Sequence, residues 1–139
     1  ADGPRSCERG SESVITADQL VAHAVGDYIL QSDWMANEKT KQSFAALAHA
    51  AVYSLPFLFL GPSIPALVAI IGTHFVIDRW RLARYVVWAK NWLGPNRPWR
   101  ECTATGYPPE RPPWMSVWLL IIADNTLHVL CNALALAYL

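Results

Sequence analysis

The sequence is poor in charged residues and in cysteine, and these shortages exclude several classes of protein. Only 16% of its 139 residues are Asp, Glu, Lys or Arg, well below the roughly 25% of ordinary soluble domains, and the net charge is zero. No overall field therefore favours nucleic acid or an acidic partner. The three cysteines, Cys7, Cys102 and Cys131, are odd in number and lack a CxxC spacing. This argues against a disulfide framework and against a zinc ribbon.

Hydrophobic residues make up 53% of the chain and gather in four segments. The pattern predicts helices over about 16–34, 43–60, 64–92 and 114–139, with a Pro-rich loop over 94–113. Because roughly 20 residues span a bilayer, we expect an all-α, four-helix transmembrane bundle. It would form a single domain over 15–139, preceded by a flexible polar tail over 1–14. The mean hydropathy of +0.19 is low for an integral protein, so a soluble four-helix bundle is the alternative.

The basic residues favour the membrane. If the four helices alternate in direction, loops 35–42 and 79–113 share one side of the bilayer, and by the positive-inside rule that side is cytoplasmic. The other side has only Arg5 and Arg9. The basic residues on the expected cytoplasmic side are Lys39, Lys41, Arg79, Arg81, Arg84, Lys90, Arg97, Arg100 and Arg111.

All four histidines lie within the apolar segments, and three of them stand four residues from an aspartate. The pairs are His23–Asp27, His74–Asp78 and Asp124–His128, while His49 stands alone. Residues four apart share one face of a helix, so each pair can direct an imidazole and a carboxylate to one point. Bare Asp and His are costly in apolar surroundings unless they are paired or bound to metal. The recurrence predicts a His/Asp metal site buried in the bundle.

The depth of these side chains supports a common site. At about 1.5 Å per residue from the expected cytoplasmic helix ends, six of the seven fall within about two helical turns. His128 comes out deepest and is the exception. Interhelical hydrogen bonding without a metal, or a proton path, is the alternative for the same residues.

Imidazole and carboxylate donors suit a divalent transition metal, with zinc first and iron or manganese as alternatives. The set exceeds what one tetrahedral ion needs, so it fits either two ions or one ion whose histidines are oriented by aspartates. Candidate catalytic residues are Asp27 and Asp124, and candidate substrate-binding residues are Gln31, Arg79 and Asn125. The expected metal ligands are His23, Asp27, His49, His74, Asp78, Asp124 and His128.

The stretches HAVGDYILQSDWMANEK (23–39), THFVID (73–78) and DNTLH (124–128) resemble a family of small bacterial and phage membrane proteins, domain of unknown function 3307. The likeness covers about residues 16–139, and Asn125 stands where the family pattern has glutamine. The resemblance implies a helical bundle in the bacterial inner membrane and supplies no activity. The first stretch is the most specific, and its matching residues are His23, Gly26, Asp27, Gln31, Asp33, Trp34 and Lys39.

Together these patterns predict a small integral membrane metalloprotein that hydrolyses a phosphoester or lipid-like substrate. Its expected partners are the lipid bilayer and a second copy of itself, and no nucleic acid. One alternative is a non-enzymatic phage or bacterial membrane protein, holin-like or partner-binding. Another is a proton or metal-ion conduit that uses the His/Asp line as its path.

Overall fold

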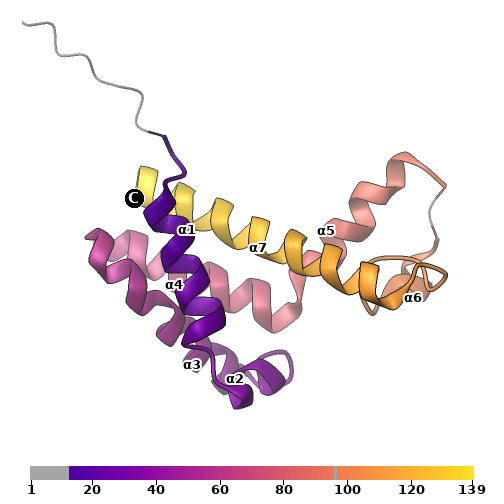
Figure 1. Ribbon diagram of the computed structural model, residues 1–139, viewed down its shortest axis with the longest axis horizontal. Helices are drawn as coiled ribbons and strands as arrows, with labels where there is room; N and C mark the ends of the chain where they lie inside the picture. The colour runs from indigo at the N-terminus through magenta and orange to yellow at the C-terminus, as the bar shows by residue number, and fades with distance from the viewer. Residues whose placement is uncertain (1–12, 96) are drawn as a thin grey trace, which may run out of the picture.

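The computed structural model describes residues 13–95 and 97–139, so most of the expected polar tail lies outside the described residues. The described chain is all-helical, as the sequence predicts. Figure 1 shows α7 running along the molecule, with α3 and α4 beneath it and α1 crossing in front. The elements are α1 (Ala17–Ala24), η1 (Val25–Ile29), α2 (Asp33–Glu38), α3 (Ser43–Ser54), η2 (Leu55–Leu60), α4 (Ile64–Trp80), α5 (Leu82–Lys90), η3 (Asn91–Leu93), α6 (Trp99–Cys102) and α7 (Pro113–Tyr138).

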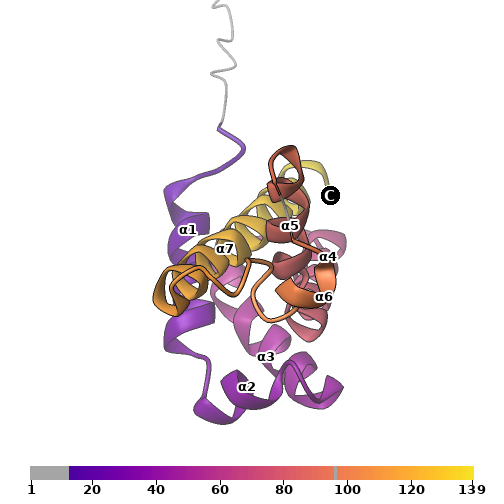
Figure 2. The ribbon, with the colours of Figure 1, turned by 90° about the vertical axis from the view of Figure 1, so that its right-hand side faces the viewer.

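Helix α4 is the centre of the packing, because it contacts both α3 and α7. α1 packs against α7 and η2, and α2 packs against α3. Figure 2, turned by 90°, shows α1 and α5 on either side of α7, with α2 and α3 below them. This arrangement brings η1, α3, α4 and α7 around one region of the interior.

The first apolar segment is shorter than its pattern predicts. The Thr16 hydroxyl accepts a hydrogen bond from the Gln19 amide and caps α1, which continues into η1, a single π-helical turn. The helix ends at Ile29 rather than near Trp34. The Ser32 hydroxyl caps α2, which replaces part of the expected polar turn. A π turn places one extra residue in the helix, and such turns occur often at functional sites.

The second segment matches its expected range, since α3 and η2 together cover 43–60. The chain changes from α-helix to 3-10 helix next to Pro56, because proline has no backbone N–H and its ring crowds the preceding turn. Gly61, with φ 64°, ends η2 in the left-handed conformation, and the Ser63 hydroxyl caps α4.

The single helix expected over 64–92 is wrong, because the chain breaks at Arg81. This residue has φ 50° and ψ 52°, a left-handed conformation that costs a non-glycine residue about 1–2 kcal/mol. Its guanidinium Nη2 donates to the Ala104 carbonyl at 3.0 Å, so a contact with a distant segment supports the break. Helix α6 lies within the range expected to be an irregular loop.

The described residues combine buried polar side chains with many exposed large apolar ones. The interior contains polar side chains and many alanines, including Ala45, Ala46 and Ala50, all fully buried. Large apolar side chains face outward instead, such as Phe59 at 94% and Ile64 at 80% exposure. Two helical stretches in the described chain, Ser43–Leu60 and Pro113–Tyr138, are long and apolar enough to cross a membrane, rather than the four expected.

Candidate metal centre

Four buried side chains from three elements form what we call the first donor group. His49 comes from α3, Asp27 from η1, and His74 and Asp78 from α4. The Nε2 atoms of the two histidines are 2.9 Å apart. His49 Nε2 lies 3.2 Å from both Asp27 Oδ1 and Asp78 Oδ2, and His74 Nε2 lies 3.1 Å from Asp78 Oδ2. Imidazole nitrogens and carboxylate oxygens therefore converge on one point.

A second donor group shares Asp78 with the first. It consists of Asp78, Asp124 and His128, with the last two supplied by α7. His128 Nε2 lies 3.4 Å from Asp78 Oδ1 and 3.4 Å from Asp124 Oδ2. The two oxygens of Asp78 thus face different groups, Oδ2 the first and Oδ1 the second. His128, the outlier in predicted depth, joins the site because α7 crosses α4 beside Asp78.

The spacing of the donors fits metal coordination. Zinc binds nitrogen and oxygen at about 2.0–2.2 Å, so two ligands of a tetrahedral ion lie roughly 3.3–3.6 Å apart. The distances in both donor groups, from 2.9 Å to 4.0 Å, surround this value. His128 Nε2 is also buried without an aligned hydrogen bond to any described residue. Buried polar atoms are normally satisfied, so this nitrogen calls for a further partner.

Packing, rather than a second hydrogen bond, orients the histidines of the first donor group. Nδ1 of His49 and Nδ1 of His74 are buried without a hydrogen-bond partner among the described residues. The ring of Tyr53 stacks on that of His74, with centroids 3.6 Å apart and an angle of 18° between the planes. Tyr53 itself is fully buried, so this contact holds the imidazole in place.

A lysine ammonium already contacts the first donor group. Lys39 Nζ lies 2.9 Å from Asp78 Oδ2, 3.8 Å from Asp27 Oδ1 and 3.4 Å from His49 Nε2. It also donates to Gln31 Oε1 at 2.8 Å. In the described chain, Lys39 is the only lysine or arginine within 4 Å of the two carboxylates. The Lys39 ammonium thus faces two buried carboxylates.

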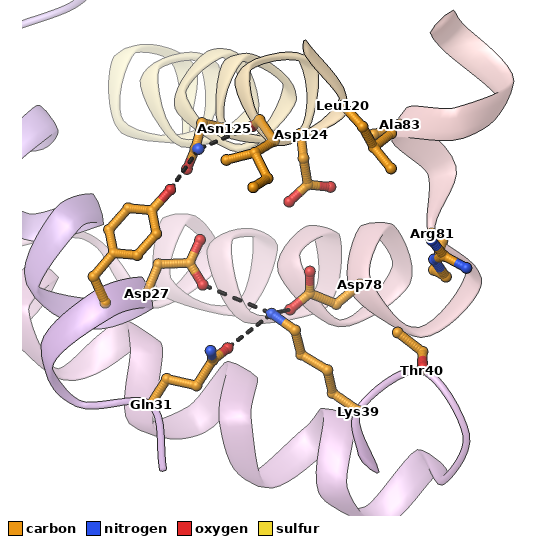
Figure 3. A pocket seen from close by; sticks show the side chains of 12 residues that line it. Asp27, Gln31, Lys39, Thr40, Asp78, Arg81, Ala83, Leu120, Asp124 and Asn125 are labelled. Carbon is orange, nitrogen blue, oxygen red and sulfur yellow. Dashed lines mark hydrogen bonds and ion pairs between the residues drawn. The ribbon is translucent and has the colours of Figure 1, made fainter. Parts of the chain in front are cut away.

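A cavity of about 250 Å³ opens beside both donor groups, and Figure 3 shows Asp27, Asp78, Asp124 and Lys39 pointing into it. Asp124 is the most accessible of the three carboxylates, with its side chain 29% exposed. The remaining lining residues are Tyr28, Gln31, Thr40, Arg81, Ala83, Leu120, Ile121 and Asn125. The cavity therefore has charged groups at its floor and an apolar wall supplied mainly by α7.

His23, an expected ligand, lies beside the donor groups but belongs to neither. Its Nδ1 lies 2.8 Å from the Tyr53 hydroxyl, and its Nε2 lies 2.7 Å from Asn125 Oδ1. Asn132 Nδ2 donates to the same hydroxyl at 2.6 Å. His23 thus connects Asn125, which lines the cavity, to the hydroxyl of Tyr53.

Two of the three expected substrate-binding residues line the cavity, and the third does not. Gln31 and Asn125 line the cavity. Arg79 does not line it; its Nη1 donates to the Thr40 carbonyl at 2.8 Å and its Nε to the Ser43 hydroxyl at 3.3 Å. Arg79, near the end of α4, therefore holds both the loop after α2 and the start of α3.

Sequence reasoning about the site missed Lys39, Tyr53 and Asn132. Lys39 had one available signal, its place in the stretch that resembles a family. Tyr53 stands four residues after His49 on the same helix, but an apolar helix carries many aromatic residues without a site. Lys41, close to Lys39 in the chain, lies apart from the site: its ammonium bonds Glu38 Oε1 at 3.0 Å and lowers the pKa of that carboxyl.

The comparisons with known proteins identify a family and supply no activity. No curated protein and no solved structure matches the sequence. The family described as protein of unknown function (DUF3307) matches residues 15–138, a range that includes every residue of both donor groups. The chain therefore belongs to this family of unknown function, DUF3307.

Proposed function

We propose that the protein is a membrane-embedded metalloenzyme that hydrolyses a phosphoester or lipid-like substrate. The observation that carries the proposal is the pair of donor groups that share Asp78. The first group offers four donors, which is the number a closed tetrahedral site needs. The second offers three donors beside the cavity, and three protein ligands with one free position are typical of catalytic zinc sites.

The donor set suits zinc, with iron or manganese as the alternatives. A bound ion would supply Lewis acidity and would lower the pKa of a coordinated water toward neutrality. Asp124 lines the cavity and is the best-placed carboxylate to accept a proton there, with Asp27 as the second candidate. Gln31 and Asn125 are placed to hold the substrate by hydrogen bonds.

The many exposed large apolar side chains support a position in the bacterial inner membrane. Outward-facing phenylalanine and isoleucine are favourable in lipid, and alanine-rich contacts are typical of helices that pack within a bilayer. The loop with Thr40 meets Arg79 at the end of α4, so these two basic regions lie at one end. At the other end, the Ser63 hydroxyl bonds the Leu139 carbonyl. We place loops 35–42 and 79–113 on the cytoplasmic side, in a four-helix transmembrane bundle.

The alternatives make different use of the same residues. A proton or ion conduit needs a polar path that continues past Tyr53 and Asn132. Beyond Tyr53 lie the buried apolar side chains of Phe57, Ile70 and Ala135, which close that direction. A non-enzymatic protein needs only helix-to-helix hydrogen bonds, and it gives no reason for His128 Nε2 to lack an aligned partner.

Elemental analysis of the detergent-purified protein tests the proposal. We expect one or two equivalents of a transition metal in the wild type and a loss of metal in a His49→Ala, His74→Ala double variant. His23→Ala is the matched control, because this histidine is also buried but lies outside both donor groups. If neither the wild type nor any variant binds metal after loading with Zn²⁺, Mn²⁺ or Fe²⁺, the metalloenzyme proposal fails. The polar residues then have a structural role.

A further inference from the structure

Lys39 combines two properties that no other described residue shares. Its ammonium contacts three donor atoms of the first donor group, and its side chain also lines the cavity. Its backbone is held in place, since its amide donates to the Met35 carbonyl and the carbonyl of the next residue, Thr40, accepts from Arg79. The flexible part is therefore the four-carbon stem, whose end can lie on the donors or in the cavity.

We propose that Lys39 is a tethered cation that occupies the first donor group without metal and moves into the cavity when a metal ion binds, where it and Arg81 form a phosphate-binding site. This inference rests on the proposed function. The ammonium lies 2.9 Å from Asp78 Oδ2 and 3.4 Å from His49 Nε2, both donors that an ion in this group would need. Two cations at such separations repel strongly in a poorly hydrated interior, so the ammonium and a metal ion exclude one another.

The cavity is the place to which the displaced ammonium can go. Arg81 and Thr40 both line it, and Figure 3 shows these two residues together on the side of the cavity opposite Asp27 and Gln31. A lysine and an arginine that face one cavity beside metal ligands match the charge and hydrogen-bonding needs of a phosphate group. The movement would therefore create the anion site only after the metal site is filled, which makes substrate binding depend on metal.

The test compares Lys39→Met with the matched control Lys41→Met in detergent, with Co²⁺ as the metal probe and inorganic phosphate as the anion probe. Lys41 is the suitable control because its side chain is 64% exposed and pairs with Glu38, outside the cavity. Co²⁺ binding is followed by visible absorption, and phosphate binding by its effect on that absorption and by calorimetry. Circular dichroism shows whether each variant is folded.

We expect Lys39→Met to bind Co²⁺ about tenfold more tightly than the wild type, a change equal to about 1.4 kcal/mol. The same variant, loaded with Co²⁺, should bind phosphate about tenfold more weakly, and Lys41→Met should leave both affinities unchanged. A residue that only holds the fold together would not move the two affinities in opposite directions. An equal or weaker Co²⁺ affinity in folded Lys39→Met overturns the inference, as does unchanged phosphate binding.

The remaining outcomes separate this inference from the proposed function. If neither the wild type nor Lys39→Met binds Co²⁺, both fail together. If only Lys39→Met binds it, the lysine is the permanent occupant of the donor group, so the metalloenzyme proposal fails and the inferred movement of Lys39 fails with it. If the wild type binds Co²⁺ and folded Lys39→Met binds it no more tightly, the inference alone fails. Should Lys39→Met not fold, Gln31→Ala removes the 2.8 Å hydrogen bond that holds the ammonium but keeps the charge. We then expect Co²⁺ affinity to rise about threefold, and no change would overturn the inference.

Discussion

Gly26 allows the π turn η1 to lie directly against α3, and a single methyl group should disturb this contact. A Cβ at residue 26 would lie 2.6 Å from the Tyr53 carbonyl oxygen and 2.8 Å from Tyr53 Cδ2. Cβ contacts below 3.0 Å are essentially absent from proteins, so η1 must retreat by about 0.4 Å or more. The nearest atom belongs to the backbone of a buried helix and cannot rotate away.

Overpacking of this kind costs about 1–3 kcal/mol, and the better helix propensity of alanine returns up to about 1 kcal/mol. We therefore expect Gly26→Ala to destabilise the protein by about 1–2 kcal/mol, or roughly 4–8 °C in the unfolding midpoint. Because Asp27 is the next residue, the same shift moves its carboxylate away from His49, now 3.2 Å distant. Metal affinity should fall along with stability.

Gly72→Ala is the matched control, since Gly72 also lies within a helix and its Cβ would meet nothing within 4 Å. It should leave stability unchanged or raise it by up to about 1 kcal/mol. Thermal unfolding in detergent, followed by circular dichroism, measures both variants. If Gly26→Ala proves as stable as Gly72→Ala, the close contact between η1 and α3 is wrong, and with it the position assigned to Asp27.

Three further predictions follow from other contacts. Gly106→Ala should lower the free energy of unfolding by more than about 2 kcal/mol, because Gly106 has φ 81° and an added Cβ would clash with the Arg84 carbonyl oxygen. Limited proteolysis of segment 91–112 measures the effect, and cleavage at the wild-type rate would contradict the prediction. Tyr53→Phe keeps the ring but removes the hydroxyl that bonds His23 and Asn132, so we expect the free energy of unfolding to fall by about 1–3 kcal/mol. An unchanged midpoint in thermal unfolding would count against these hydrogen bonds. Asp78→Ala should abolish metal binding at both donor groups, whereas Asp124→Ala should weaken metal binding only at the second. If elemental analysis finds the same loss of metal in both variants, the two groups do not share Asp78.

Much of the site was accessible from the sequence because its residues are spaced along helices. His74 and Asp78 lie four apart on α4, and their side chains do meet at 3.1 Å. Asp124 and His128 meet in the same way on α7, at 3.4 Å. A helix converts this spacing into contact without help from the rest of the molecule. The same spacing did not bring His23 into a donor group with Asp27, and His23 contacts Tyr53 and Asn125 instead.

Local sequence patterns could not predict the break at Arg81 or the short helix α6. The residues around Arg81 have good helix propensity, and only the contact of its guanidinium with Ala104 shows why a left-handed residue is tolerated there. The contrast between Arg79 and Arg81 has the same origin. Both are arginines after Asp78, and the direction of the chain after α4 determines which of them reaches the cavity.

The all-helical class, the apolar segments and the His/Asp donors can be read from the sequence, because helical periodicity and side-chain chemistry are local properties. The sharing of Asp78 by two donor groups, and the reach of Lys39 onto the first, depend on how α7 crosses α4 and where the loop after α2 is held. These are contacts between segments far apart in the chain. Their geometry is decided by packing, and no spacing along the sequence encodes it.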